Sequence, residues 1–498
     1  MTISDDWPDQ TTRPGARIDL EYLRPLVDRQ VGDVPLEAMV SRISNKQYTI
    51  TTLLAQVEDW VTNGFRLGHD GSLTGKHHHS NYKSALEFKS GVTKSLLKRL
   101  DTSKTVGPFA WTQDMSDIPM PDCAVNPIGA VRYKYEHDRA RACDDPFINT
   151  AIDPPGFTMD AMDRLRAAAF PGCSWLKSDV ASAFPCMNLC QEDLPWMLFA
   201  WYHPDDTDFT GTDQDCLCLH THGNFGPRPF PHHFTMLMLL VNVAAKSLGL
   251  ELPAAFIDDN IHTGKIMELR QMAPRYWEHM LRSGLKDKEA KREFVLLRGD
   301  LLGVWFDSIR MTLSIPQDKL KRLSDTITGH LQSKKASYAE LSHLLGYWEF
   351  CVTVLPKFMK GFMHSLNVAR NALRQLSKDK HRWLSKRAVH DLTTILELVP
   401  LVNNTVAIRP RDGRTRSEPC CTDASGGSKA AAAWVTPSEY QHWSFSGRRK
   451  KEIIAILEGD AVEQYLSDKA ADLAGSIAPM YIDNTVFLYA LRKGHSKT

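Results

Sequence analysis

The stretch AAFIDDNIHTG, residues 254–264, places two adjacent carboxylates, Asp258 and Asp259, directly after an apolar run. Apolar residues on both sides of a short polar segment predict a buried β-hairpin with the acids at its tip. Buried carboxylates are costly unless they are paired, protonated or bound to a cation. The stretch therefore predicts an acidic site carried by a short hairpin.

A third acid stands in a similar setting upstream. The stretch LKSDVASAF, residues 176–184, is consistent with a strand that delivers Asp179 to its end. Three acids in two strand-like contexts could bind two divalent ions about 3.5–4 Å apart, which hold the attacking and leaving oxygens of a phosphoryl transfer. Magnesium suits such a site because it takes oxygen ligands and keeps waters and substrate phosphates. The competing interpretation of either motif alone is a solvated turn.

Five stretches in a fixed order strengthen the catalytic interpretation. They are Asp179, FGPRPFPHHF (225–234), FIDD (256–259), GLKDKEAK (284–291) and LLGVWFD (301–307). This series resembles the successive palm motifs of reverse transcriptases. The resemblance implies that Asp179, Asp258 and Asp259 are catalytic acids that bind Mg²⁺ or Mn²⁺, with Phe256 replacing the usual tyrosine of the Tyr-x-Asp-Asp box. It also makes Lys291, or alternatively Lys288, a candidate general acid for the departing pyrophosphate.

Stretches N-terminal to Asp179 indicate a particular group of reverse transcriptases. NYKSALEF, VGPF (106–109), NPIGAVRYK (126–134) and PFINTAI (146–152) resemble the fingers of tyrosine-recombinase retrotransposons of the DIRS, Ngaro and VIPER type. The likeness covers roughly residues 60–498 and implies substrate-binding residues, with Arg139 and Arg141 as alternatives for one triphosphate contact. These residues are Arg132, Lys134, Arg139, Arg141, Val180, Phe184, Phe225 and Gly226.

Two of these positions carry a specific expectation from the family. The ring of Phe184 would collide with a ribose 2′-hydroxyl, so the polymer made is expected to be DNA. Gly226 would let the backbone approach the template and base pair closely. The implied activity is an RNA-directed DNA polymerase, a nucleotidyltransferase with an RNA template, a DNA primer, dNTPs and the RNA–DNA hybrid as partners.

The C-terminal segment carries a second set of acids. TDAS (422–425) on a strand, KKEIIAIL (450–457) on a helix and YIDN (481–484) at a strand end resemble an RNase H-like fold. The resemblance makes Asp423, Glu452 and Asp483 its metal ligands. Because the sequence continues for only 15 residues after Asp483, we expect a truncated domain with weak or absent hybrid cleavage.

Composition and charge fit this interpretation. The net charge is +1, yet residues 317–390 contain 14 Lys or Arg against 5 Asp or Glu. Such a segment can follow a phosphate backbone, or it can be a solvated helical face. No apolar run approaches the roughly 20 residues that span a bilayer, and the N-terminus lacks a signal-peptide pattern. We therefore expect an intracellular protein, cytoplasmic or nuclear and not secreted, with its ten cysteines as free thiols.

The expected fold class is α+β: a right-hand polymerase with fingers, palm and thumb, followed by a partial RNase H-like α/β domain. The expected divisions are a helical region (1–100), fingers and palm (101–310), a basic helical thumb and connection (311–408), a linker (409–419) and the RNase H-like domain (420–498). A helix is expected at 234–248, and SYAE (337–340) has the spacing of a capping box.

Two other functions, and a metal site at either of two stretches, compete with parts of this account. The chain could be an inactive retroelement relic that binds nucleic acid without polymerising, although all three palm acids are present. An RNA-dependent RNA polymerase is disfavoured by Phe184 and by the C-terminal domain. KHHHS (76–80) is expected to be a surface loop, and DCLCLHTH (215–222) an ordinary strand in preference to a zinc site.

Overall fold

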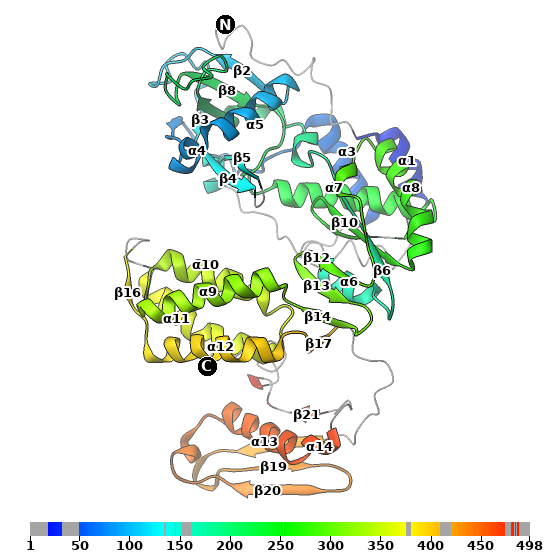
Figure 1. Ribbon diagram of the computed structural model, residues 1–498, viewed down its shortest axis with the longest axis vertical. Helices are drawn as coiled ribbons and strands as arrows, with labels where there is room; N and C mark the ends of the chain where they lie inside the picture. Colours follow the sequence, from blue (N-terminus) through cyan, green and yellow to red (C-terminus); the bar gives the residue numbers. More distant parts are fainter. Residues whose placement is uncertain are drawn as a thin grey trace. The chain divides into compact units, whose positions relative to one another are not determined.

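The chain forms two compact units in the computed structural model (Figure 1). The first comprises Met1–Ala168 and Cys173–Leu296, and the second comprises Ala169–Gly172 and Leu297–Thr498. Within them, the structure describes residues 18–31, 49–133, 136–144, 146–151, 161–251, 253–374, 380–408, 420–473, 480–482, 484 and 486–487.

Helix α7 (Phe230–Lys246) is the centre of the first unit and is buried on nearly all sides, as its continuous apolar sequence requires. It contacts α1 (Leu20–Asp28), α3 (Ile50–Asn63) and α8 (Ile266–Arg282). The predicted helix at 234–248 is confirmed, but it begins four residues earlier. A proline in the first turn is tolerated because the N–H groups there lack helical partners anyway.

A four-stranded antiparallel sheet with the order β11-β6-β10-β9 lies beside α7. Its strands are β6 (Ser174–Asp179), β9 (Ala254–Phe256), β10 (Asp259–Gly264) and β11 (Glu293–Val295). The predicted hairpin at 254–264 and the predicted strand ending at Asp179 are both confirmed. The hairpin tip is half-buried, because Phe256 to Asp259 retain partial exposure.

A second sheet of the first unit has the order β1-β3-β7-β8-β2. Its strands are β1 (Lys76–His78), β2 (Thr105–Phe109), β3 (Cys123–Asn126), β7 (Leu198–Trp201) and β8 (Cys216–His220). Beside it lie the β4–β5 hairpin (Ile128–Tyr133 and Glu136–Asp144) and the helices α4 (Lys83–Glu87) and α5 (Lys89–Asp101). Helix α6 (Ala161–Ala168) instead contacts β9 and β10 of the first sheet. The strand predicted from DCLCLHTH is confirmed as β8.

The loop predicted for KHHHS is wrong, because this stretch forms the edge strand β1. β1 pairs in parallel with β3. The ring of His77 stacks on Phe147 at 4.1 Å, and His78 accepts or donates a hydrogen bond with Gln214 at 2.8 Å. Stacking and pairing together hold these histidines as a strand.

The second unit begins with the antiparallel sheet β12-β13-β14-β17. Its strands are Arg298–Leu301, Val304–Asp307, Thr312–Ser314 and Val406–Ala407. A helix layer follows, formed by α9 (Gln317–Ser333), α10 (Tyr338–Cys351), α11 (Met363–Leu373) and α12 (Lys386–Val402). The predicted capping box is confirmed, because Ser337 and Glu340 exchange side chain to backbone hydrogen bonds.

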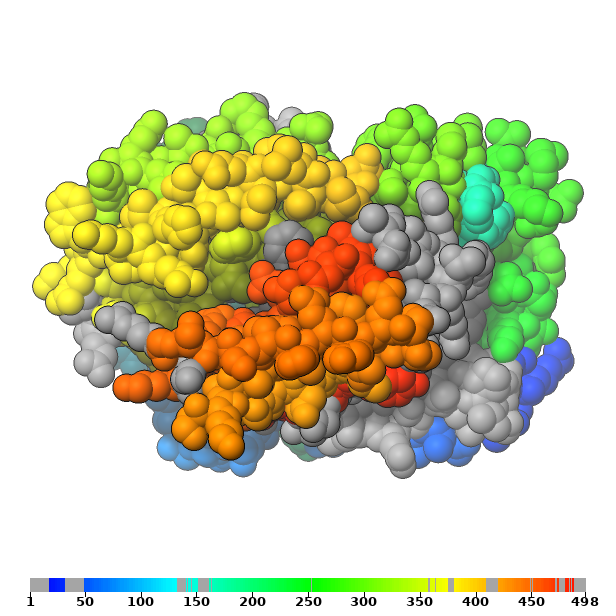
Figure 2. Space-filling model, turned by 90° about the horizontal axis from the view of Figure 1, so that it is seen from below, coloured from blue at the N-terminus to red at the C-terminus, as the bar shows by residue number. Residues whose placement is uncertain are grey.

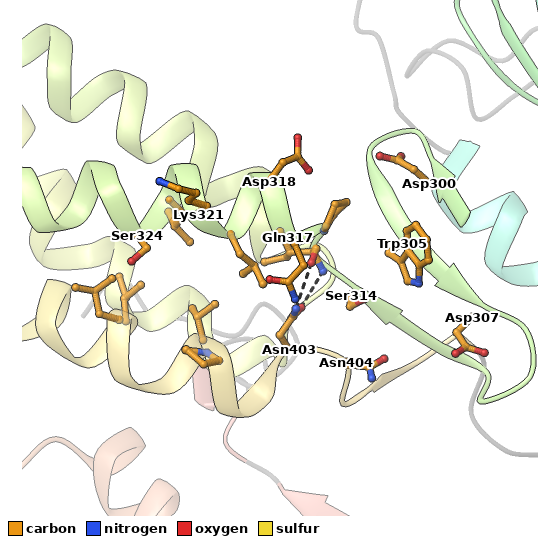
Figure 3. Close-up of a pocket in the computed structure, with 18 of the residues that line it drawn as sticks. Asp300, Trp305, Asp307, Ser314, Gln317, Asp318, Lys321, Ser324, Asn403 and Asn404 are labelled. Atoms are coloured by element: carbon orange, nitrogen blue, oxygen red, sulfur yellow. Dashed lines mark hydrogen bonds between the residues drawn. The ribbon is translucent and has the colours of Figure 1, made fainter. Parts of the chain in front are cut away.

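Asn403 ties the sheet to the helix layer. Its side chain accepts a hydrogen bond from the Ile315 N–H at 2.8 Å and donates one to the Ile315 carbonyl at 3.2 Å (Figure 3). A cavity of about 940 Å³ lies beside this junction, between β12–β14 and helices α9 and α12.

The C-terminal part of the second unit is a sheet with the order β20-β19-β18-β21, in which β18 and β21 are parallel. Its strands are β18 (Cys420–Ser425), β19 (Ala431–Val435), β20 (Tyr440–Ser444) and β21 (Met480–Ile482). Helices α13 (Ile454–Asp468) and α14 (Ala470–Leu473) follow, and α13 packs on β18 and β19. This sheet contributes to the orange surface in front in Figure 2. The expected linker at 409–419 lies outside the described residues.

In the parts of the chain that the structure describes, no helix is both long and apolar enough to cross a membrane.

Candidate active site

Three acids meet where β6 ends and β10 begins. Asp179, the last residue of β6, is the direct partner of Asp259, the first residue of β10. Residues directly opposite in an antiparallel pair have Cβ atoms about 4.5–5.5 Å apart. Asp258 lies in the preceding turn, where its carbonyl accepts a hydrogen bond from the Val180 N–H at 3.0 Å. The register therefore brings Asp179 together with Asp259, 80 residues later in the sequence, and with its neighbour Asp258.

The backbone conformation at the tip allows this meeting. Ile257 has a φ of 53°, a left-handed conformation that is uncommon for a branched residue. The strained residue lets the chain reverse between β9 and β10 within two residues, so that Asp259 enters the strand in register with Asp179.

Burial and neighbouring charge raise the pKa values of two of these carboxyl groups, Asp258 and Asp259. Burial, with the charges of Asp258 and Asp179, raises the pKa of Asp259 to about 6. Burial and the charge of Asp179 also raise the pKa of Asp258 above its ordinary value. A raised carboxyl pKa means that the ionised form is disfavoured. A cation placed among these groups would relieve that cost.

Two lysines already approach Asp179. The Lys288 ammonium lies 2.5 Å from one carboxylate oxygen of Asp179, and Lys291 donates a hydrogen bond to the other. Burial lowers the pKa of Lys291, but the hydrogen bond and charge of Asp179 act in the opposite direction and leave that pKa above its ordinary value. The backbone of Lys288 is held as well, since its N–H donates to the Asp179 carbonyl at 2.8 Å. Both candidate general acids therefore lie at the site.

The donor set fits a magnesium ion in its chemistry. Carboxylate oxygens are the ligands that Mg²⁺ prefers, and burial, together with the neighbouring carboxylates, raises the pKa of Asp258 and of Asp259. The side-chain placement does not close around an ion, because no group of three His, Cys, Asp or Glu among the described residues is arranged to hold a metal. Asp179 would have to exchange its lysine partners for the ion.

A cavity of about 830 Å³ opens beside the acids, and it exposes residues that the sequence reasoning missed. Phe184, Phe225, Asp258 and Lys288 line one part of it. One face of α5 lines another part, with the residues Gly91, Lys94, Ser95, Lys98, Arg99 and Thr102. The sequence does contain one signal for this surface. Lys94 and Lys98 are four residues apart, a spacing that places both side chains on one face of a helix.

Phe184 lies at this cavity within a cluster of aromatic rings. Its centroid is 5.2 Å from that of Phe225 and 6.0 Å from that of Phe230. The side chain is 8% exposed, so most of its surface contributes to the core. Phe184 therefore lines the cavity while its packing against Phe225 and Phe230 holds the ring in place.

Gly226 makes a close approach, but to another part of the protein. It has a φ of 134°, and a Cβ there would collide with the carbonyl of Asp144 at the end of β5. The Asp144 N–H also donates to the Phe225 carbonyl at 2.8 Å. In this structure the glycine therefore brings the segment before α7 against the end of β5. Its predicted approach to the template stays a prediction.

The remaining predicted substrate residues have fewer described contacts. Arg132, Arg139 and Arg141 lie on the β4–β5 hairpin, with Arg132 opposite Ala140. Ala140 itself lines the cavity. The side chain of Val180 is buried next to the acids. Lys134 lies outside the described residues.

The C-terminal acids are only partly arranged as predicted. Asp423 lies on β18 and is exposed, while Asp483 lies outside the described residues. Placing Glu452 on a helix was wrong: it follows the 3₁₀ turn Gly447–Lys451, and α13 begins only at Ile454 because Ile453 is extended. The acid that α13 turns toward β18 is Glu458, which is buried and accepts a hydrogen bond from the Ala424 N–H at 3.2 Å. Sequence reasoning missed Glu458.

Solved structures of the foamy viral protease-reverse transcriptase share this fold. The complex with dsDNA aligns with a TM-score of 0.50 at 11% identity, covering 95% of this chain and 90% of the viral chain. The complex of the dRH form with ds DNA aligns with a TM-score of 0.49 at 12% identity, covering 96% of this chain and 77% of the viral chain. The complex with RNA/DNA hybrid also aligns with a TM-score of 0.49, at 10% identity, covering 96% of this chain and 59% of the viral chain. No protein-family model and no curated protein matches the sequence. The likeness shows a mixed α/β, reverse-transcriptase-like fold.

We expect the raised pKa of Asp259 to appear as a pH-dependent cost in stability. Its carboxyl binds a proton more tightly in the folded than in the unfolded chain, so ionisation between about pH 4 and 6 lowers the free energy of unfolding. Asp259→Asn removes this titration. In metal-free buffer, the variant should therefore gain thermal stability over the wild type as the pH rises from 4 to 7. Asp208→Asn, at an exposed turn position, is the control. A stability difference that does not change with pH would contradict the electrostatic account.

Proposed function

We propose that this chain is the RNA-directed DNA polymerase of a tyrosine-recombinase retrotransposon. The observation that carries the proposal is the β6–β10 register, which sets Asp179 opposite Asp259 beside a cavity large enough for a nucleotide. The reverse-transcriptase-like fold supports it. The reaction is attack of a primer 3′-hydroxyl on the α-phosphate of a deoxynucleoside triphosphate. The partners are an RNA template, a DNA primer and the RNA–DNA hybrid that they form.

In this proposal, each group of residues at the site has its own role in the reaction. Asp179, Asp258 and Asp259 hold divalent cations, Mg²⁺ or Mn²⁺, which supply positive charge at the reacting phosphate when bound. Lys291 or Lys288 lies close enough to the acids to give a proton to the departing pyrophosphate. The cations of α5 hold phosphate groups on the opposite side of the cavity. Phe184 limits the room beside the sugar.

A specific observation favours a second candidate function, a nucleic-acid-binding relic without polymerase activity. Lys288 and Lys291 neutralise Asp179 directly, which is the role that a cation has in the active enzyme. If these lysines held Asp179 permanently, the cations would not bind and the chain would bind nucleic acid only.

Residual RNase H activity is a weaker proposal for the C-terminal sheet. Asp423 on β18 and Glu452 before α13 are the ligands that the family resemblance supplies, together with Asp483. Glu458 offers a further carboxylate beside Ala424. Hybrid cleavage that depends on Asp423 would support this assignment.

Primer extension on an RNA template tests the proposed polymerase. Wild-type protein with Mg²⁺ or Mn²⁺ should extend a DNA primer, and Asp258→Asn should lower the rate at least about a thousandfold, since metal-assisted charge stabilisation is worth several kcal/mol. Asp205→Asn is a matched control, because it makes the same chemical change at an exposed position. No extension by the wild type with either metal would favour the relic.

Removing two cations of α5 tests the second wall of the cavity. The double variant Lys94→Ala/Lys98→Ala should raise the KM for dNTP or the Kd for the primer–template by roughly a hundredfold when both lysines contact phosphate and roughly tenfold when one does, because each charge-assisted contact contributes about 1.5–3 kcal/mol. Which constant moves identifies whether nucleotide or template phosphates lie on α5. Lys83→Ala, an exposed lysine on α4, is the control. Unchanged KM and Kd would show that α5 takes no part in phosphate binding.

Sugar selection tests Phe184. Phe184→Val shortens the side chain at the cavity, and we expect ribonucleotide incorporation to rise relative to deoxynucleotide incorporation. The ratio of the two kcat/KM values is the measurement, because it cancels any loss of folded protein caused by the smaller core residue. An unchanged ratio would limit Phe184 to a packing role.

A further inference from the structure

A small surface at the far end of the helix layer combines cations with an exposed tryptophan. It is formed by the two-stranded pair β15 (Lys335–Ala336) and β16 (Arg382–Trp383), which follows the C-terminus of α9 and precedes α12. We call it the tip patch and define it by Lys334, Lys335, Lys380, Arg382 and Trp383. Figure 1 shows β16 at the opposite end of the helices from β12–β14.

Trp383 is held in place and yet open to solvent. It pairs with Lys335 across the two strands, and the Lys335 ammonium lies 4.5 Å from the centroid of its ring. The Leu384 N–H donates to the Lys334 carbonyl at 2.9 Å, which fixes the strand that carries the tryptophan. The residue remains 69% exposed. A positioned but exposed indole points to a partner, because tryptophan is usually well buried.

The surroundings of Trp383 are strongly basic. Lys334, Lys335, Lys380 and Arg382 are all exposed, and in the described part of the chain none of their side chains forms an ion pair. His381 beside them pairs with Glu340 at 3.1 Å. Glu340 also belongs to the capping box of α10, in which its carboxylate accepts a hydrogen bond from the Ser337 N–H. The patch therefore presents four cations whose charge is available to an outside anion.

We propose that the tip patch binds single-stranded nucleic acid, with the cations on its phosphates and an unpaired base stacked on Trp383. Cationic side chains next to an aromatic ring form the usual platform for single strands. A duplex fits less well, because its bases are already stacked on one another. The proposal deepens the proposed function by naming a binding surface, and it rests on that function only for the kind of partner.

The patch is distinct from the candidate active site. Both strands belong to the second unit, whereas the three acids belong to the first. The 17 residues of α9 span about 25 Å and separate the tip patch from β14.

Fluorescence anisotropy with the full chain tests this surface. The probes are a 20-nucleotide single-stranded RNA and a blunt 20-base-pair duplex, both in EDTA so that no polymerisation occurs. Trp383→Ala should weaken binding of the single strand about tenfold and binding of the duplex much less. The variant Lys334→Glu/Lys335→Glu/Arg382→Glu should reduce the slope of log K against log salt by roughly two for the single strand. Thermal unfolding confirms that each variant is folded.

Two exposed positions outside the patch serve as controls. Lys83→Glu on α4 reverses a charge elsewhere, and Tyr440→Ala on β20 removes an exposed aromatic ring. Both should bind the single strand as the wild type does. The proposal is overturned if Trp383→Ala binds as the wild type, if single strand and duplex weaken equally, or if the variant changes only the oligomeric state. Because the assay needs no catalysis, absence of primer extension would count against the polymerase and leave this result unaffected.

Discussion

The pairing of β6 with β10 is the constraint on which the candidate site depends. Six consecutive residue pairs fix this register, from Asp259 opposite Asp179 to Gly264 opposite Ser174. A shift of one residue would turn every side chain of β10 to the other face of the sheet. Asp259 would then leave the face of Asp179, and His262 would leave its buried position against Tyr276. The packing of the sheet and the meeting of the acids are therefore set by the same register.

In this structure, two lysine side chains neutralise part of the negative charge of the site. Asp179 satisfies its two oxygens with Lys288 and Lys291, while Asp258 and Asp259 carry the cost of burial as raised pKa values. Divalent cations and lysines compete for the same oxygens. The balance between them separates an active polymerase from a nucleic-acid-binding relic.

The sequence predicted the local elements of the site well, because their signals are local. The apolar run before Asp258 predicted the hairpin, and the run before Asp179 predicted a strand that ends there. The helical face of α5 was missed, since its role depends on a cavity formed with Phe184 and Phe225 from distant segments. Contacts with distant segments of the chain also explain why the loop predicted for KHHHS was wrong. A surface loop was expected because three adjacent histidines cannot all face one metal ion, but stacking on Phe147 and pairing with β3 make this stretch a strand.

The C-terminal sheet shows the same limit of sequence reasoning. The resemblance to an RNase H-like fold placed Glu452 on a helix, but Ile453 is extended and α13 begins only at Ile454. The acid that contacts β18 is Glu458, six residues later, and only the packing of α13 on the strand identifies it. A motif gives the order of acids along the chain, whereas the start of a helix decides which of them faces the sheet.

The central claim is that Asp179, Asp258 and Asp259 together hold divalent cations, and anomalous X-ray diffraction from crystals soaked in Mn²⁺ tests it most directly. The account predicts a manganese peak in contact with carboxylate oxygens of Asp179 and at least one of the other two acids, with Lys288 and Lys291 displaced from Asp179. Crystals saturated with Mn²⁺ that show no peak at these acids, with both lysines still bound to Asp179, would contradict it.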